Sequence, residues 1–255
     1  MTITDRTVTP TPQKDSLRRT AFVAGAFYLI TFVTSVPTLI LYGPVHGADF
    51  VLGAGSDTGV LVGAFLEVLL ALSGVGTAVA LYPVVRRQND SLALGFVTSR
   101  VLEAAGILVG VMSLLTLLTL RQHLAGATGA AASSLVTSGS ALVAFHDWSF
   151  VLSQSLMPSV NALLLGSLMY RSGLVPRIIP LLGLIGAPLL FASVTATIFG
   201  AYDQTSTVAL IAALPVAVWE FSLGTWLVVK GFRPSPITAA PTGTSAPPAH
   251  HAPAL

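Results

Sequence analysis

The chain has 255 residues, of which 53% are hydrophobic and only 9% are charged, and its mean hydropathy is +0.82. Because an ordinary soluble domain carries about 25% charged residues, this composition excludes a soluble globular protein and predicts a multi-pass membrane protein. The net charge of +2 gives no sign of a nucleic-acid partner, and the lack of cysteine excludes disulfides, thiolate metal sites, iron–sulfur clusters and cysteine nucleophiles.

Six apolar runs follow one another with short connections, and each is long enough to cross a bilayer. The predicted fold is therefore an all-α integral membrane bundle of about six transmembrane helices within residues 16–233, without a separate soluble enzyme domain. The predicted spans are about 20–42, 59–82, 92–120, 145–170, 178–200 and 208–229. The polar residues 1–15 and the Pro/Ala/Thr-rich residues 234–255 are predicted to be disordered tails.

Two features flank the third span on its outer side. Arg121 closes the run, and we expect it to lie at the outer surface, where its replacement by alanine would be nearly silent. The Ala/Gly/Ser-rich segment that follows, Leu124 to about Ser140, is interpreted as a short interfacial helix that precedes the fourth span.

Basic residues predict the orientation. Arg121 lies on one side of the predicted bundle and Arg100 lies inside a span. All the other basic residues fall on the opposite side: Arg6, Lys14, Arg18, Arg19, Arg86, Arg87, Arg171, Arg177, Lys230 and Arg233. The positive-inside rule therefore predicts that both termini are cytoplasmic, in agreement with an even number of spans.

Ionisable residues inside the apolar runs are the main candidates for function. Arg100 and Glu103 are three residues apart, so they share one face of a helix. Since each ionisable residue in a bilayer costs roughly 2.5–3.5 kcal/mol, we expect partners in other spans. The candidate intramembrane polar core is Glu67, Arg100, Glu103, Gln154, Asn161 and Glu220.

The depth of each polar residue follows from a rise of about 1.5 Å per helical residue. Arg100, Glu103, Asn161 and Glu220 fall in one layer, whereas Glu67 and Gln154 fall in a second layer closer to the outside. If Arg100 and the three glutamates were all ionised, the core would carry a net charge of −2. We therefore expect at least one carboxylate to be protonated or neutralised by a bound cation.

Two segments carry a family resemblance. They read NALLLGSLMYRSGLVPR from Asn161 to Arg177 and WEFSLGTWLVVKGF from Trp219 to Phe232. The chain resembles, over about Leu17 to Phe232, the bacterial membrane family named domain of unknown function 4386. The resemblance implies an uncharacterised bacterial protein of about six helices in the cytoplasmic (inner) membrane, and it supplies no catalytic residues.

The hairpin between the fourth and fifth spans is interpreted as an anchored cytoplasmic turn. Gly173 permits a tight conformation, Pro176 starts the next helix, and two arginines lie at the headgroups. The residues of this cytoplasmic hairpin are Tyr170, Arg171, Gly173, Pro176 and Arg177.

Three classes of function remain open from the sequence. A structural or regulatory protein predicts a dry, fully paired polar core. A small-solute or ion carrier coupled to protons or cations predicts a water-accessible cavity beside the glutamates. An intramembrane enzyme is the least supported class, since the chain has no phosphate loop, dinucleotide fingerprint or Gly-x-Ser-x-Gly motif.

The expected partners and cofactors follow from these three classes of function. The lipid bilayer is the expected environment, and the carrier interpretation adds a small ion or polar ligand. The outer-side residues His46, Asp49, His123, His146 and Asp147 have no recognised zinc spacing. No metal, cofactor or catalytic residue is therefore predicted, and the sequence defines neither a protein partner nor an oligomeric state.

Overall fold

The computed structural model describes residues 11–239, so most of the two predicted tails lies outside the described residues. Within this range the chain is helical and forms no strand. The described residues include six helices that are long and apolar enough to cross a membrane. The all-α bundle of six spans that the sequence predicts is confirmed.

The main helices follow the apolar runs with somewhat different bounds. The first span consists of α1 (Thr11–Ser35), followed by the short α2 (Thr38–Leu41) and the 3-10 turn η1 (Gly43–His46). The remaining elements are α3 (Asp57–Val85), α4 (Asp90–His123), α5 (Gly129–Phe150), the π-helix η2 (Val151–Leu156), α6 (Met157–Ser172), α7 (Ile178–Ile198), α8 (Thr207–Val229) and the 3-10 turn η3 (Pro236–Thr238).

Helix α4 packs against α3, α5 and α6. Helix α1 packs against α3 and α8, and α7 packs against α6 and α8. Small residues allow the closest approaches. A Cβ atom on Gly25 of α1 would lie 2.6 Å from the backbone oxygen of Gly224 in α8, so the two backbones touch at this point.

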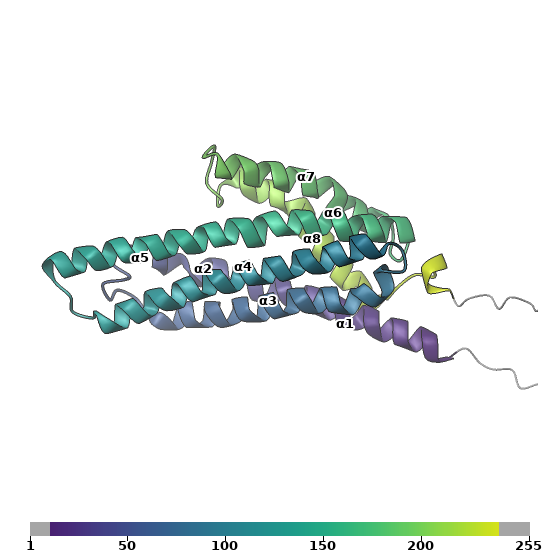
Figure 1. The fold of residues 1–255 in the computed structure, drawn as a ribbon, viewed down its shortest axis with the longest axis horizontal. Helices are drawn as coiled ribbons and strands as arrows, with labels where there is room; N and C mark the ends of the chain where they lie inside the picture. The colour runs from purple at the N-terminus through teal and green to yellow at the C-terminus, as the bar shows by residue number, and fades with distance from the viewer. Residues whose placement is uncertain (1–10, 240–255) are drawn as a thin grey trace, which may run out of the picture.

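The two ends of the bundle differ. The start of α1 and η3 lie at one end, which we call the terminal end (Figure 1). The opposite, distal end contains the α4–α5 connection and residues 42–56, which we call the distal segment (Figure 1). At this end α3, α4 and α5 extend beyond α7 and α8.

The predicted interfacial helix at residues 124–140 is wrong. Instead, α5, η2 and α6 form one continuous helix, Gly129–Ser172, of 44 residues. Leu135, Gly139 and Val143 recur every four residues and are buried along one face of α5. Because Gly139 has no side chain, Leu117 of α4 and Val51 of the distal segment pack closely against it. The Ala/Gly/Ser composition therefore reflects close helix packing rather than an interfacial position.

Arg121 also differs from expectation, because it is buried rather than exposed at the surface. Its Nε atom lies 2.9 Å from a carboxylate oxygen of Asp57 at the start of α3. Its guanidinium donates hydrogen bonds to four backbone carbonyls, those of Phe50, Gly53, Ala54 and Gly55. Arg121 thus fastens the distal segment to the bundle, so we expect its replacement to destabilise the protein.

At the terminal end, the chain after α8 packs on the α6–α7 hairpin. The amide of Arg233 donates to the carbonyl of Leu174 at 2.7 Å, and the hydroxyl of Ser235 donates to the carbonyl of Ser172 at 2.5 Å. Arg233 and Ser235 are therefore each held by a backbone carbonyl of the hairpin, and Ser235 lies in the segment that the sequence places in a disordered tail.

Candidate functional site

The central polar layer is organised around Arg100 of α4, which is 3% exposed. Its Nη1 atom donates to both carboxylate oxygens of Glu103, at 3.2 and 3.0 Å, and its Nη2 atom donates to Glu220 of α8 at 2.6 Å. Asn161 of α6 donates to Glu103 at 2.6 Å. The structure thus brings together the four residues that the sequence places in one layer, and it links three helices through them.

Two aromatic rings complete the surroundings of the guanidinium. The Arg100 carbon Cζ lies 5.2 Å from the ring centroid of Tyr28 in α1 and 5.9 Å from that of Phe96 in α4. Such distances allow cation–π attraction, which grows when the cation is removed from water. The sequence-based site omits Tyr28, which is fully buried. Like the residues of that site, it is a polar residue within an apolar run.

The second polar layer surrounds Glu67 of α3, which is 1% exposed. The hydroxyl of Tyr42 donates to its Oε2 atom at 3.0 Å, and the side-chain amide of Gln154 donates to its Oε1 atom at 2.9 Å. The Nε2 atom of His146 lies 3.7 Å from Oε2. The pairing of Glu67 with Gln154 follows the predicted layer, whereas the sequence does not predict the contacts with Tyr42 and His146.

From Glu67 the polar contacts continue outward to the distal end. The Nδ1 atom of His146 lies 3.5 Å from Oδ1 of Asp147, and Nε2 of His46 lies 3.3 Å from the same oxygen. In the part of the chain that the structure describes, no group of three or more His, Asp or Glu residues has the arrangement of a metal site.

Gln154 projects from the π-helix η2. Pro158 begins the following turn of α6 and has no amide N–H to donate to the carbonyl four residues earlier, which is that of Gln154. A π-turn absorbs this break and changes the direction of the side chains, as is frequent at functional sites. Gln154 consequently contacts Glu67 and also lines the cavity of the central layer.

The central cavity has a volume of about 180 Å³. Arg100, Glu103, Gln154 and Glu220 supply its charged and amide groups. The other walls come from α1, α3, α6, α7 and α8 and include Thr31, Phe32, Ser35, Leu70, Pro158, Leu190, Ala213, Val216 and Ala217. The charged groups of the central layer therefore border open space.

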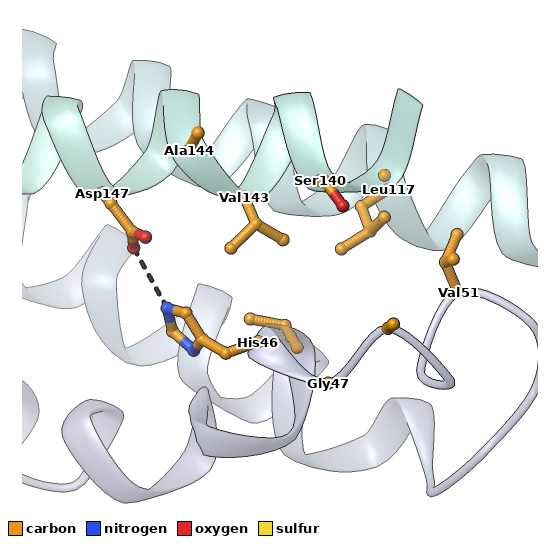
Figure 2. A pocket seen from close by; sticks show the side chains of 11 residues that line it. His46, Gly47, Val51, Leu117, Ser140, Val143, Ala144 and Asp147 are labelled. Atoms are coloured by element: carbon orange, nitrogen blue, oxygen red, sulfur yellow. Dashed lines mark hydrogen bonds and ion pairs between the residues drawn. The ribbon is translucent and has the colours of Figure 1, made fainter. Parts of the chain in front are cut away.

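A second cavity, the distal pocket, has a volume of about 220 Å³. It lies between residues 45–51, Leu117 of α4 and residues 139–147 of α5. Figure 2 shows His46 and Asp147 facing each other at one end of this pocket, joined by their ion pair. The outermost members of the Glu67 network therefore line a pocket at the distal end.

The predicted hairpin residues lie at the terminal end, away from both cavities. Gly173 caps α6 with a φ of +66°, a conformation that favours glycine. Arg177 lies with its guanidinium carbon 5.6 Å from the ring centroid of Tyr170. Arg171 is exposed, and Pro176 precedes α7 rather than starting it. This geometry describes a tight, capped turn.

The six apolar helices and the buried polar layers define a multi-pass helical membrane protein with an ionic core. A family model described as "Domain of unknown function (DUF4386)" matches residues 23–231, which is most of the chain. The chain belongs to this family, and the resemblance stated from the sequence is confirmed. No curated protein and no solved structure matched the chain.

Proposed function

We propose that this protein is a carrier of the bacterial cytoplasmic membrane that binds a small cation, or a small polar solute together with a proton, in the central cavity. The observation that supports the proposal is the cavity itself, since two carboxylates and one guanidinium border open space inside an apolar bundle. A purely structural ion pair has no need of such a space.

The charge of the cavity favours a cation or a proton. Arg100 is shared between Glu103 and Glu220, so the three groups together carry one net negative charge when all are ionised. Even at an effective dielectric constant of about 20, unit charges about 4 Å apart interact by about 4 kcal/mol. An additional positive charge between the carboxylates is therefore stabilised.

The polar core is also incompletely paired within the protein. Among the described residues, the hydroxyl of Tyr28, the Nε atom of Arg100 and the Oδ1 atom of Asn161 are buried without a hydrogen-bond partner. Each buried, unpaired polar group costs about 1–3 kcal/mol. Of these three residues Arg100 lines the cavity, so a ligand there can approach the guanidinium whose Nε atom lacks a partner.

Thermal unfolding of the detergent-purified protein tests this proposal. Unfolding is followed across pH in chloride salts of lithium, sodium, potassium, ammonium and guanidinium, with N-methylglucamine chloride holding the ionic strength constant. At a cation concentration 100 times the dissociation constant, binding stabilises the folded state by about 2.7 kcal/mol, so the melting temperature should rise for the cation that fits.

The variant Glu220→Gln should lose this rise, because it removes one of the two carboxylates that face the cavity. Asp203→Asn, at an exposed position outside the cavity, serves as the matched control and should keep it. If no salt or pH change separates wild type from Glu220→Gln, the structural role of the polar core is the better interpretation.

The orientation is a separate prediction. With both termini cytoplasmic, reporter fusions after Arg87, Arg177 and Arg233 should report the cytoplasm, because basic residues cluster at that end. Fusions after Gly55, Gly129 and Asp203 should report the outside. An external C-terminus would contradict the positive-inside assignment.

A further inference from the structure

We propose that His46, Asp147, His146 and Glu67 form a proton-transfer chain that leads from the distal pocket to the central cavity. The inference deepens the proposed function, on which it rests, by assigning a route to the proton. Consecutive members lie 3.3, 3.5 and 3.7 Å apart and come from η1, α5 and α3. These separations are near hydrogen-bonding distance, so small side-chain movements bring each pair within reach.

Both imidazoles lie between two oxygen acceptors. The ring nitrogens of His46 face the carbonyl of Tyr42 and the carboxylate of Asp147, each at 3.3 Å. Those of His146 face the carboxylates of Asp147 and Glu67. A neutral imidazole carries only one N–H, so it can donate to only one of its two acceptors. Each ring is therefore placed to hold an additional proton and to pass it to a neighbour.

Among residues 11–239, no lysine or arginine forms an ion pair with Glu67 or Asp147. The titratable and polar groups that contact Glu67 from other elements are Tyr42, Gln154 and His146. The ring of Tyr42 packs edge-on against His146, with centroids 5.1 Å apart. Helix α4 presents Gly110 to His146, and a Cβ atom there would lie 3.3 Å from Cδ2 of the ring, so the imidazole packs directly against the backbone of α4. Between His46 and Glu67, the proton therefore meets only these histidines and carboxylates.

The transfer conserves protons at every step. Water in the distal pocket protonates His46, whose side chain is 52% exposed. Asp147 accepts this proton on Oδ1 and passes it to Nδ1 of His146. His146 then releases the proton on Nε2 to Oε2 of Glu67, which leaves the ring with its proton on Nδ1. Before the next transfer the ring reorients, so that this N–H faces Glu67 and the bare nitrogen faces Asp147. Only N–H and O–H bonds form and break.

Gln154 connects the inner end of the chain to the central cavity. Its amide holds the Oε1 atom of Glu67 at 2.9 Å, and its side chain lines the cavity, as does Leu70, one turn after Glu67 on α3. Glu67 itself does not line the cavity, so the last transfer requires a water molecule that enters beside Gln154 and Leu70 and reaches Glu67. Glu103 and Glu220, which line the cavity, then accept the proton. The proton-transfer chain thus ends at the carboxylates of the proposed binding site.

Hydrogen–deuterium exchange of the Glu67 carboxyl group tests the route. The infrared carboxyl band of Glu67 is assigned in the reconstituted, full-length protein by its loss in Glu67→Gln. Its deuteration is then timed after the outside buffer is changed to D₂O. His146→Phe keeps an aromatic ring but removes both nitrogens, and it should slow deuteration by about tenfold or more, in line with the usual contribution of a positioned proton-transfer group.

Two further variants complete the test. His46→Gln alters a half-exposed residue, and it should also slow deuteration. His123→Gln, at an exposed distal position outside the proton-transfer chain, should leave the rate unchanged. Unchanged rates in both His146→Phe and His46→Gln, or no Glu67 band between about pH 4 and pH 9, which spans the reference values of Glu and His, would overturn the proposal. Because no cation or solute is added, this result is independent of the thermal-unfolding test.

Discussion

Replacing Arg100 with methionine is expected to lower the free energy of unfolding by about 3–5 kcal/mol. The guanidinium is 3% exposed and is the cation shared by Glu103 and Glu220, so its removal leaves both carboxylates buried without a positive partner. Methionine is of similar length, which limits the contribution of lost packing. The measurement is thermal or denaturant unfolding of the detergent-purified protein.

The controls separate charge from side-chain length. Arg171→Met, at an exposed position in the α6–α7 hairpin, should leave stability nearly unchanged. Adding Glu103→Gln and Glu220→Gln to Arg100→Met removes the uncompensated charges and should recover most of the loss. If Arg100→Met alone is as stable as wild type, the ion pairs do not stabilise the association of α4 with α8.

The substitution Arg121→Ala is expected to cost roughly 2–4 kcal/mol and to free the distal segment. The guanidinium bonds four backbone carbonyls between residues 50 and 55, and its carbon lies 4.3 Å from the ring centroid of Phe50. Without it the carbonyls of Gly53, Ala54 and Gly55 lose the donor that the guanidinium supplies, that of Phe50 keeps only the amide of Gly53, and Asp57 loses its ion pair. Proteolysis within residues 47–56 should accelerate together with the loss of thermal stability.

The variant Arg121→Lys separates the stabilisation that comes from the several N–H donors of the guanidinium from the stabilisation that comes from its charge. A lysine keeps the positive charge near Asp57, but its single nitrogen cannot span four carbonyls, so it should restore only part of the stability. Gln122→Ala, at the neighbouring exposed position, loses one surface hydrogen bond to Asp57 and should change stability little. Wild-type behaviour of Arg121→Ala would show that the distal segment is held by its apolar contacts.

The sequence predicts the central layer well because its physical constraint is strong. An ionisable residue in an apolar span needs a partner at the same depth, and helical rise converts residue number into depth. The depths of Arg100, Glu103, Asn161 and Glu220 agree, and the structure joins these residues by hydrogen bonds. The pairing of Glu67 with Gln154 follows from the same argument.

The distal half is less predictable because its contacts depend on the connections between the helices. Depth alone does not show that the chain after α1 continues through α2 to place Tyr42 on Glu67. The continuation of α5 into η2 and α6 brings His146 and Asp147 to the same network, and it is hidden by the weakly apolar composition before residue 141. Arg121 illustrates the same difficulty, since its partners are backbone carbonyls, which carry no signal in the side-chain sequence.

The central claim is that the cavity beside Arg100 and Glu220 is open to water, and the natural lack of cysteine allows a direct measurement. Ala217→Cys places a thiol on the cavity wall, whereas Leu214→Cys, on the same helix, places one on the exposed apolar face of α8. Because the thiolate is the reactive species, a small water-soluble thiol reagent modifies cysteines that contact water.

In proteoliposomes, the account predicts that the cysteine at position 217 reacts readily and that the one at position 214 does not. Reaction at position 217 should also slow in the presence of the cation that raises the melting temperature. An unreactive cysteine at position 217 in a folded protein would show a dry core and would contradict the account.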